Sequence, residues 1–252
     1  MATTRQNVLI TGASSGLGAE MARQLAGRGH DLALCARRTD RLESLQAEIV
    51  TAHPGRRVEV RALDVNDDDQ VFAVFRAFRA DFGTIDRVIV NAGLGKGAPL
   101  GTGRYEANKE TAVTNFVAAL AQTEAAMEIF RDQGDGHLVM ISSMSAMRGM
   151  PKNMTTYAAT KAGVAHLAEG LRYELHGKPI AITVIYPGYI ASEMNERVSK
   201  QTSLMVSTQK GVRAMVAAIE KEKDSACVPP LPWAPMSLLM KHAPLPVLKK
   251  LM

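Results

Sequence analysis

A tyrosine and a lysine four residues apart, Tyr157 and Lys161, are the side chains of this sequence that point most directly to chemistry. They fall in a predicted helix over residues 155–176, where positions i and i+4 share one face, with side-chain roots about 5 to 6 Å apart. A phenol titrates near pH 10, and a neighbouring ammonium favours its ionised form. Although such a pair also arises by chance on helix surfaces, it predicts a general acid and base at Tyr157, with Lys161 lowering its pKa.

The second feature is a glycine-rich turn at residues 11–18, which joins an apolar run at 7–10 to a helical pattern at 19–26. A strand, a glycine turn and a helix start in this order bring backbone N–H groups and the positive end of a helix dipole against a pyrophosphate. Alone, such a turn is also an ordinary strand-to-helix connection. We interpret it as a dinucleotide cradle, and the predicted contacts are Gly12, Ser14, Ser15, Gly16, Leu17 and Gly18.

Two arginines indicate which dinucleotide fits. Arg37 and Arg38 end a second apolar strand at residues 32–36, about 20 residues after the last glycine, where the adenosine ribose is expected. A carboxylate there would repel a 2′-phosphate, whereas a guanidinium pairs with it. The sequence therefore predicts NADP (NADPH) rather than NAD, with a solvated pair of turn arginines as the alternative.

The same turn also satisfies the pattern Gly-x-Ser-x-Gly at Gly12, Ser14 and Gly16, the nucleophile elbow of serine hydrolases. An elbow this close to the amino terminus leaves no earlier strand or loop to donate an oxyanion N–H. Hydrolysis would also leave Arg37, Tyr157 and Lys161 without a role. We therefore expect a dinucleotide cradle rather than a hydrolase.

The elements that must position these residues alternate between strands and helices. Further apolar strands are predicted at residues 57–63, 88–90, 137–142 and 180–185, and further helices at 41–53, from about 67, and at 107–131. Strands this apolar are buried on both faces, which predicts a parallel sheet with helices on both sides and right-handed crossovers. The fold class is therefore α/β.

Several short motifs occur one after another along the chain. Through these motifs the chain resembles the short-chain dehydrogenase/reductase family over about residues 7–195. These motifs are the glycine turn, Asn91-Ala92-Gly93, Asn115, Ser142-Ser143, Tyr157-Ala158-Ala159-Thr160-Lys161 and Tyr186-Pro187-Gly188. The resemblance implies a single-domain, doubly wound Rossmann fold of about seven parallel strands. It also implies hydride transfer between a nicotinamide and a ketone, an aldehyde or a secondary alcohol.

The resemblance also implies a role for each motif residue. Tyr157 would be the proton donor to the carbonyl oxygen, Lys161 would bind the nicotinamide ribose, and Ser143 would hold the substrate oxygen. Asn115 would hold a water that links the lysine to solvent. The remaining implied cofactor contacts are Asp64 and Val65 at the adenine, Asn91, Ala92 and Gly93 at a strand end, and Pro187, Gly188 and Ile190 beside the nicotinamide.

One departure from the family pattern concerns the serine. It commonly precedes the tyrosine by 13 residues, whereas Ser143 lies 14 residues before Tyr157. An extra residue in the loop at 150–156 would keep Ser143 in register with its strand. Ser142 and Ser145 remain alternatives for the catalytic serine.

The substrate pocket is expected to be apolar. Several methionines lie near the motifs, at positions 144, 147, 150, 154, 194 and 205. Thioether side chains suit either a lipophilic substrate or ordinary loop packing. Residues 191–206 are a candidate lid. Neither the substrate nor the direction of reaction follows from the residues.

The carboxyl-terminal part differs in composition, so we divide the chain into a catalytic domain at 1–223 and an extension of that domain at 224–252. The extension is rich in proline and apolar residues and starts with a possible edge strand at Cys227-Val228. Packing on its own domain or on a second subunit is favoured over contact with a membrane surface or cover for the substrate pocket.

Composition limits the function classes. The net charge is +5, but the basic residues are dispersed, which argues against nucleic-acid binding. Six histidines lack paired ligand spacing, so we expect no metal. Two distant cysteines, Cys35 and Cys227, and the lack of a secretory or spanning segment predict a cytoplasmic protein with free thiols.

Two expectations concern partners and activity. Relatives in the family pair through two long helices, here at 107–131 and 155–176, which implies a homodimer or homotetramer. The main alternative to an enzyme is a catalytically silent NADP-binding sensor or interaction protein on the same fold. The presence of Asn115, Ser143, Tyr157 and Lys161 together favours an enzyme.

Overall fold

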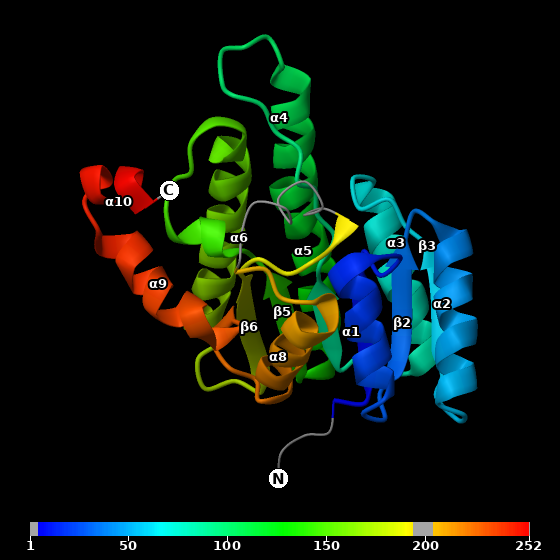
Figure 1. Ribbon diagram of the computed structural model, residues 1–252. Coiled ribbons are helices and arrows are strands. Elements are labelled where there is room, and N and C mark those ends of the chain that lie inside the picture. Colours follow the sequence, from blue (N-terminus) through cyan, green and yellow to red (C-terminus); the bar gives the residue numbers. More distant parts are fainter. Residues whose placement is uncertain (1–4, 194–203, 252) are drawn as a thin grey trace.

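The structure is a computed structural model that describes residues 5–193 and 204–251. Within these residues seven parallel strands form one sheet, in the order β3-β2-β1-β4-β5-β6-β7 (Figure 1). The strands are β1 (Asn7–Thr11), β2 (Asp31–Ala36), β3 (Val58–Ala62), β4 (Arg87–Val90), β5 (Gly136–Ile141), β6 (Ile180–Pro187) and β7 (Ser225–Val228). The strand order reverses between β1 and β4, so the predicted doubly wound Rossmann sheet is confirmed.

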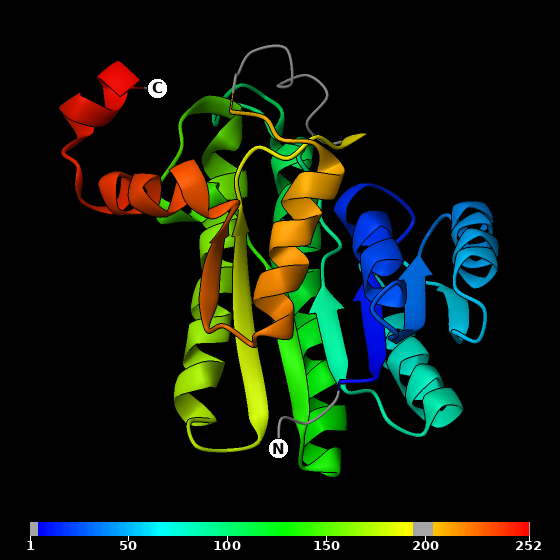
Figure 2. The same ribbon diagram turned by 60° about the horizontal axis from the view of Figure 1, so that its bottom comes forward.

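Helices cover both faces of the sheet (Figures 1 and 2). They are α1 (Gly16–Ala26), α2 (Thr39–Ala52), α3 (Asp68–Phe82), α4 (Tyr105–Ala112), α5 (Ala118–Gln133), α6 (Thr155–Glu174), α8 (Thr208–Glu220), α9 (Pro230–His242) and α10 (Leu245–Leu251). Successive strand residues point to opposite faces. Leu9 therefore packs in the core with α3, α5 and α6, whereas Val8 and Ile10 pack in the core with α1, α2 and α8.

The predicted continuous helix at 107–131 is wrong in one respect. A π-helical turn at Val113–Val117 separates α4 from α5 and contains Asn115. Such turns insert one extra residue into a helix and occur often at functional sites. Asn115 is 1% exposed, so the turn directs an amide into the protein interior.

The carboxyl-terminal extension contributes to the sheet and then leaves it. β7 pairs with β6, as the predicted edge strand required, and α9 and α10 project from the body beyond it (Figure 2). The buried side of α9 carries Trp233 and Met240, which cluster with Met144. The proline-rich extension therefore forms helices, and the inner side of α9 packs on the rest of the chain.

A buried polar network lies at the amino ends of the strands. Arg87 is 2% exposed and its Nε donates to Nδ1 of His137 over 2.8 Å. Because arginine can only donate, His137 must be the neutral tautomer that donates from Nε2 to Thr183 Oγ1 over 2.8 Å. Burial, and secondarily the charge of Arg87, lowers the pKa of His137 well below its usual value. Glu220 at the end of α8 neutralises Arg87 through an ion pair.

Candidate active site

The glycine turn lies at the carboxyl end of β1 and leads into α1. Gly12 has a φ of +64°, and a Cβ there would lie 2.9 Å from Ala92 Cα. A Cβ on Gly18 would lie 2.4 Å from the carbonyl oxygen of Gly12. Glycine at these two positions therefore lets the turn pack against the end of β4 and against itself. A Cβ on Gly16 would have Ser192 Cβ, at 3.6 Å, as its nearest neighbour among the described residues, so the start of α1 is open to close approach there, which fits the pyrophosphate of a dinucleotide.

The end of β4 is tied to the same turn. Thr11 Oγ1 accepts hydrogen bonds from the backbone N–H groups of Asn91 and Ala92, at 3.0 and 3.2 Å. In return, Asn91 Nδ2 donates to the carbonyl of Thr11 over 2.9 Å. The predicted cofactor residues at the ends of β1 and β4 therefore lie side by side.

The two predicted phosphate arginines differ in their surroundings. Arg38 donates to Ser15 Oγ over 2.7 Å and to Ser14 Oγ over 3.2 Å, which places its guanidinium over the glycine turn. Arg37 is exposed and makes no side-chain hydrogen bond or ion pair within residues 5–193 and 204–251. The structure thus brings Arg38, but not Arg37, onto the cradle.

Sequence reasoning missed two residues at this position, Arg41 and Glu193. The Glu193 carboxylate lies 2.7 Å from Arg41 Nη1 and 3.4 Å from Arg38 Nη1. The hydrogen bond from Arg41 is the largest cause of a lowered pKa at Glu193. The position of Arg41 one helical turn after Arg38 was an available signal, whereas nothing local indicated Glu193.

Asp64 and Val65 follow β3 at the adenine side of the predicted site. The backbone N–H of Leu63 donates to the carbonyl of Ala36 over 3.0 Å, which holds this segment beside the end of β2. Asp64 Oδ1 accepts from the backbone of Asn66 over 3.1 Å, and Val65 is buried. Both residues lie at the carboxyl edge of the sheet, as the resemblance implied.

The three hydroxyl groups near Tyr157 have different partners. Ser142 Oγ donates to the carbonyl of Lys161 over 2.7 Å, so this hydroxyl fastens α6 to β5. Ser143 Oγ accepts from Ser145 Oγ over 2.9 Å and lies close enough to the hydroxyl of Tyr157 to lower the pKa of that phenol. The geometry therefore favours Ser143 over Ser142 as the serine that meets the tyrosine.

The electrostatics of Tyr157 differ from the expectation. Burial raises the pKa of Tyr157, and the interaction with Ser143 is what lowers it. Lys161 Nζ lies 5.9 Å from the centroid of the phenol ring and donates to the carbonyl of Ile141 over 2.8 Å. Burial also lowers the pKa of Lys161 to about 8. The predicted lowering of the tyrosine pKa by the lysine is thus not found in the chain by itself.

Asn115 and Gly93 complete this cluster. Asn115 Oδ1 accepts from the backbone N–H of Leu94 over 2.7 Å, and its Nδ2 donates to the carbonyl of Leu94 over 2.9 Å. A Cβ on Gly93 would lie 3.2 Å from Asn115 Oδ1 and 3.5 Å from Lys161 Nζ. Glycine therefore lets the end of β4 approach both side chains.

The Pro187-Gly188 turn ends β6 on the other side of the cluster. The backbone N–H of Gly188 donates to the carbonyl of Val228 over 2.9 Å, and a Cβ there would overlap the Trp233 ring at 2.1 Å. Ile190 is buried and forms a parallel bridge with Val206. Trp233 is a contact that sequence reasoning missed, because it comes from the extension.

Methionines gather beside Ser143. Met144, Trp233 and Met240 form a buried cluster, and the partly buried residues packed against it are Met147, Met150, Tyr186, Cys227 and Met236. Met154 is 36% exposed. The proposed lid spans 191–206, but its residues 194–203, Met194 included, lie outside the described residues.

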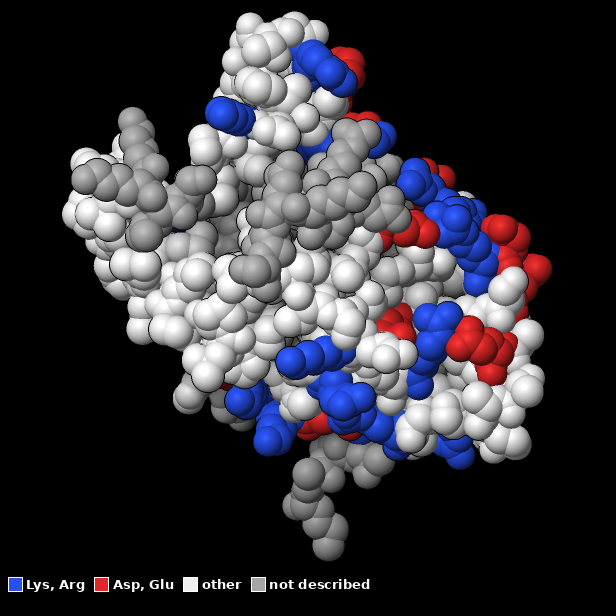
Figure 3. Space-filling view, viewed as in Figure 1, with Lys and Arg blue, Asp and Glu red and all other residues white. Residues whose placement is uncertain are grey.

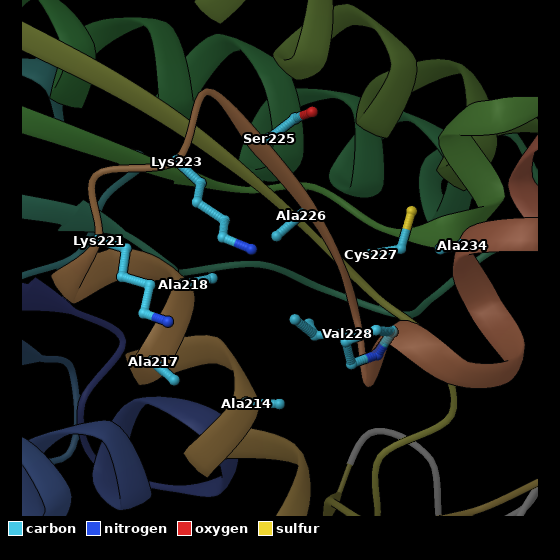
Figure 4. Close-up of a pocket in the computed structure, with 11 residues that line it drawn as sticks. Ala214, Ala217, Ala218, Lys221, Lys223, Ser225, Ala226, Cys227, Val228 and Ala234 are labelled. Carbon is cyan, nitrogen blue, oxygen red and sulfur yellow. The ribbon is translucent and has the colours of Figure 1, made fainter.

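A separate groove of about 430 Å³ lies between α8, β7 and the start of α9 (Figure 4). It is lined largely by alanines, and Lys221 and Lys223 extend toward it. None of the predicted site residues lines it. This groove is therefore distinct from the cluster around Tyr157.

Ser14 is the residue on which the alternative of a nucleophile elbow depends. Ser14 accepts hydrogen bonds from Arg38, and within the described part of the chain no histidine forms a hydrogen bond with it. Among the described residues, no group of three or more His, Cys, Asp or Glu side chains could hold a metal ion. No described helix is long and apolar enough to cross a membrane.

Comparisons with known proteins cover nearly the whole chain. A family model described as short chain dehydrogenase matches residues 6–203. An uncharacterized oxidoreductase of Mycobacterium tuberculosis is 55% identical over 237 residues, covering 94% of this chain and 93% of the relative. A short-chain dehydrogenase from Sphingobium yanoikuyae in complex with NADPH is similar with a TM-score of 0.83 and 29% identity, covering 97% and 95% of the two chains. A short chain dehydrogenase/reductase from Burkholderia phymatum in complex with NAD has a TM-score of 0.82 at 21% identity, covering 93% and 92%.

Proposed function

The chain belongs to the short-chain dehydrogenase family and is an oxidoreductase of that type, and from that premise we propose that it transfers a hydride between NADP(H) and a lipophilic ketone, aldehyde or secondary alcohol. The observation that carries the proposal is that Tyr157 interacts with Ser143 beside the buried ammonium of Lys161, whose Nζ lies 5.9 Å from the centroid of the phenol ring. These groups meet at the carboxyl edge of the sheet, where ligands of such folds bind.

The cofactor preference rests on Arg38. Its guanidinium already bridges the hydroxyls of Ser14 and Ser15 at the glycine turn, where it can pair with a 2′-phosphate. The start of α1 at Gly16 fits the pyrophosphate, and Asp64 with Val65 bounds the adenine side. When bound, the cofactor supplies or accepts the hydride.

The side chains of the cluster handle the proton and the substrate oxygen. Tyr157 is proposed to donate a proton to the carbonyl oxygen during reduction, while Ser143 holds that oxygen by a hydrogen bond. Because burial raises the pKa of Tyr157, the neutral phenol is available as the acid. Lys161 is proposed to hold the nicotinamide ribose. Asn115 is proposed to hold a water through which the proton returns to Tyr157. The direction of the reaction then depends on the supply of reduced and oxidised cofactor.

The substrate class rests on the apolar wall beside Ser143. Met144 and Trp233 bury their side chains there, and Met147 and Met150 pack against them. Flexible thioethers accommodate bulky apolar groups. We therefore propose a lipophilic substrate.

A second copy of the chain is proposed to pack against α5 and α6. Phe116, Val117 and Leu120 are 36–48% exposed, and Tyr173 on α6 is 90% exposed. Large apolar side chains left open on neighbouring helices are typical of subunit interfaces. The free thiols of Cys35 and Cys227 agree with a proposed cytoplasmic location.

Two measurements test this function. Replacing Tyr157 with Phe should abolish NADPH-dependent reduction of a carbonyl panel and leave NADPH binding intact. Equal activity in the variant would defeat the mechanism, and a wild-type protein that binds NADPH without turnover of the panel would favour the sensor.

The cofactor preference is tested by thermal shift. NADPH should stabilise the protein more than NADH does at equal concentration. Arg38→Gln should remove that difference, whereas Arg37→Gln serves as the matched control and should keep it. Greater stabilisation by NADH would contradict the preference.

A further inference from the structure

The outer surface of α9 and α10 is largely apolar in the described residues. Apart from Lys241 and His242, every exposed residue between 231 and 247 is apolar. The largest exposed side chains are Leu231 at 77%, Leu238 at 63%, Leu245 at 57%, Leu239 at 46% and Val247 at 43%. The two helices project from the body, so these side chains are presented beyond the compact domain (Figure 2).

The charge of this segment has one sign. Residues 225–252 contain no aspartate or glutamate, whereas they contain Lys241, Lys249 and Lys250. The charged residues that Figure 3 shows lie mainly over other elements, and the surface over α9 carries no acidic side chain. An apolar surface accompanied only by cations is complementary to an anionic lipid surface.

We propose that the outer surface of α9 and α10 docks on an anionic membrane surface. The exposed leucines enter the boundary between headgroups and acyl chains, and the lysines pair with lipid phosphates. Attachment is peripheral, because no described helix is long and apolar enough to cross a membrane.

The charge pattern also distinguishes a membrane from a second copy of the chain. In a symmetric dimer the same patch would meet itself, so its lysines would lie in an interface to which both copies bring only positive charge. The segment offers no acidic side chain to pair with them. Lipid phosphates supply the missing negative charge.

α9 connects this surface to the candidate active site. On its buried side Trp233 contacts Gly188 and clusters with Met144, the residue after Ser143. Arg148, in the loop after Met147, donates to the carbonyl of Lys241 over 3.1 Å. With the proposed function as premise, docking holds the substrate side of the enzyme next to a lipid phase that dissolves lipophilic carbonyls.

Flotation of the purified full-length protein with vesicles tests the docking. Vesicles of equal parts phosphatidylcholine and phosphatidylglycerol should carry the protein upward, and phosphatidylcholine alone or high salt should weaken this several-fold. The double variant Leu238→Glu/Leu245→Glu should bind about 30-fold more weakly, since two leucines lose their burial in lipid. Lys241→Gln should bind about fivefold more weakly.

The matched control is Leu100→Glu, which changes a leucine of 66% exposure in the loop before α4 and should bind vesicles like the wild type. Lack of flotation would overturn the proposal, as would equal flotation with neutral vesicles at all salt concentrations. Self-association that Leu238→Glu abolishes, without vesicle binding, would assign the surface to a second copy. Vesicle binding involves no turnover, so its failure is distinguishable from failure of the oxidoreductase proposal.

Discussion

The buried pair of Arg87 and Glu220 gives a prediction whose size follows from the structure. Replacing Glu220 with Gln removes the carboxylate that neutralises a guanidinium of 2% exposure. Arg87 cannot release its proton at accessible pH, so the variant must keep a buried charge without its counterion. We expect a large loss of stability without any change in the active-site residues.

The magnitude comes from the pKa of Glu220, which hydrogen bonding to His30 and then the charge of Arg87 lower from 4.5 to about 2. Each unit corresponds to about 1.4 kcal/mol, so the ionised carboxylate contributes about 3 kcal/mol to the free energy of unfolding at pH 7. Because the pKa is lowered on folding, this contribution is complete above pH 4.5 and is lost as the pH falls toward 2.

Urea unfolding followed by circular dichroism, at one protein concentration, measures this effect. Glu220→Gln should lower the free energy of unfolding by about 3 kcal/mol at pH 7, and the difference should fall to about half that near pH 3.5. Glu128→Gln breaks the exposed pair with Arg76 and is the matched control, expected within about 0.5 kcal/mol of wild type. If Glu220→Gln costs no more than this control, the reasoning about buried charge is refuted.

Three further predictions concern the site. Because burial lowers the pKa of Lys161 to about 8, Lys161→Met should raise the free energy of unfolding by about 1–3 kcal/mol at pH 7 while removing activity. Thermal melts should show that this gain in stability shrinks between pH 8 and 10.5. A variant that is less stable than the wild type at pH 7 would contradict the prediction. Glu193→Gln should increase the affinity for NADPH about fivefold without changing the affinity for NADH, because the carboxylate that competes with the 2′-phosphate for Arg38 is gone. Fluorescence titration measures both affinities, and equal gains for the two cofactors would refute the competition. Gly18→Ala should destabilise the protein, since its Cβ meets the Gly12 carbonyl, whereas Gly170→Ala, with open space in α6, should stabilise it by about 0.5–1 kcal/mol in the same melts.

The sequence was sufficient for the fold because β1, β2, β4, β5 and β6 are short, largely apolar runs, whereas β3 alternates apolar and charged residues. The predicted strand at 137–142 corresponds to Gly136–Ile141, and that at 180–185 to Ile180–Pro187. The π-helical turn around Asn115 could not be predicted, because one extra residue barely alters the apolar period of a helix. Proline also obscured α9. Leu231 has non-helical dihedral angles, so Pro235 lies in the first regular turn, where proline is tolerated because the first backbone N–H groups of a helix have no partner within it.

The site was predicted where its residues are close in sequence, and less completely where they are not. Tyr157 and Lys161 share a helix face, and the spacing was enough to place them together. Arg41 and Glu193 meet across 152 residues, a contact that only the folded chain creates. The direction of the Tyr157 pKa shift could not be predicted from the sequence either, because it depends on burial and on the direction in which Lys161 points.

The amino and carboxyl ends of the strands differ in a way that affects where substitutions are tolerated. At the amino ends of the strands, Arg87 and His137 are fixed by each other and by partners from β6 and α8, whereas the carboxyl ends of the strands lead into loops. Mutations that remodel those loops leave the anchored amino ends intact. New specificities can therefore be selected at one end of this scaffold while the opposite end maintains its tolerance of further substitutions.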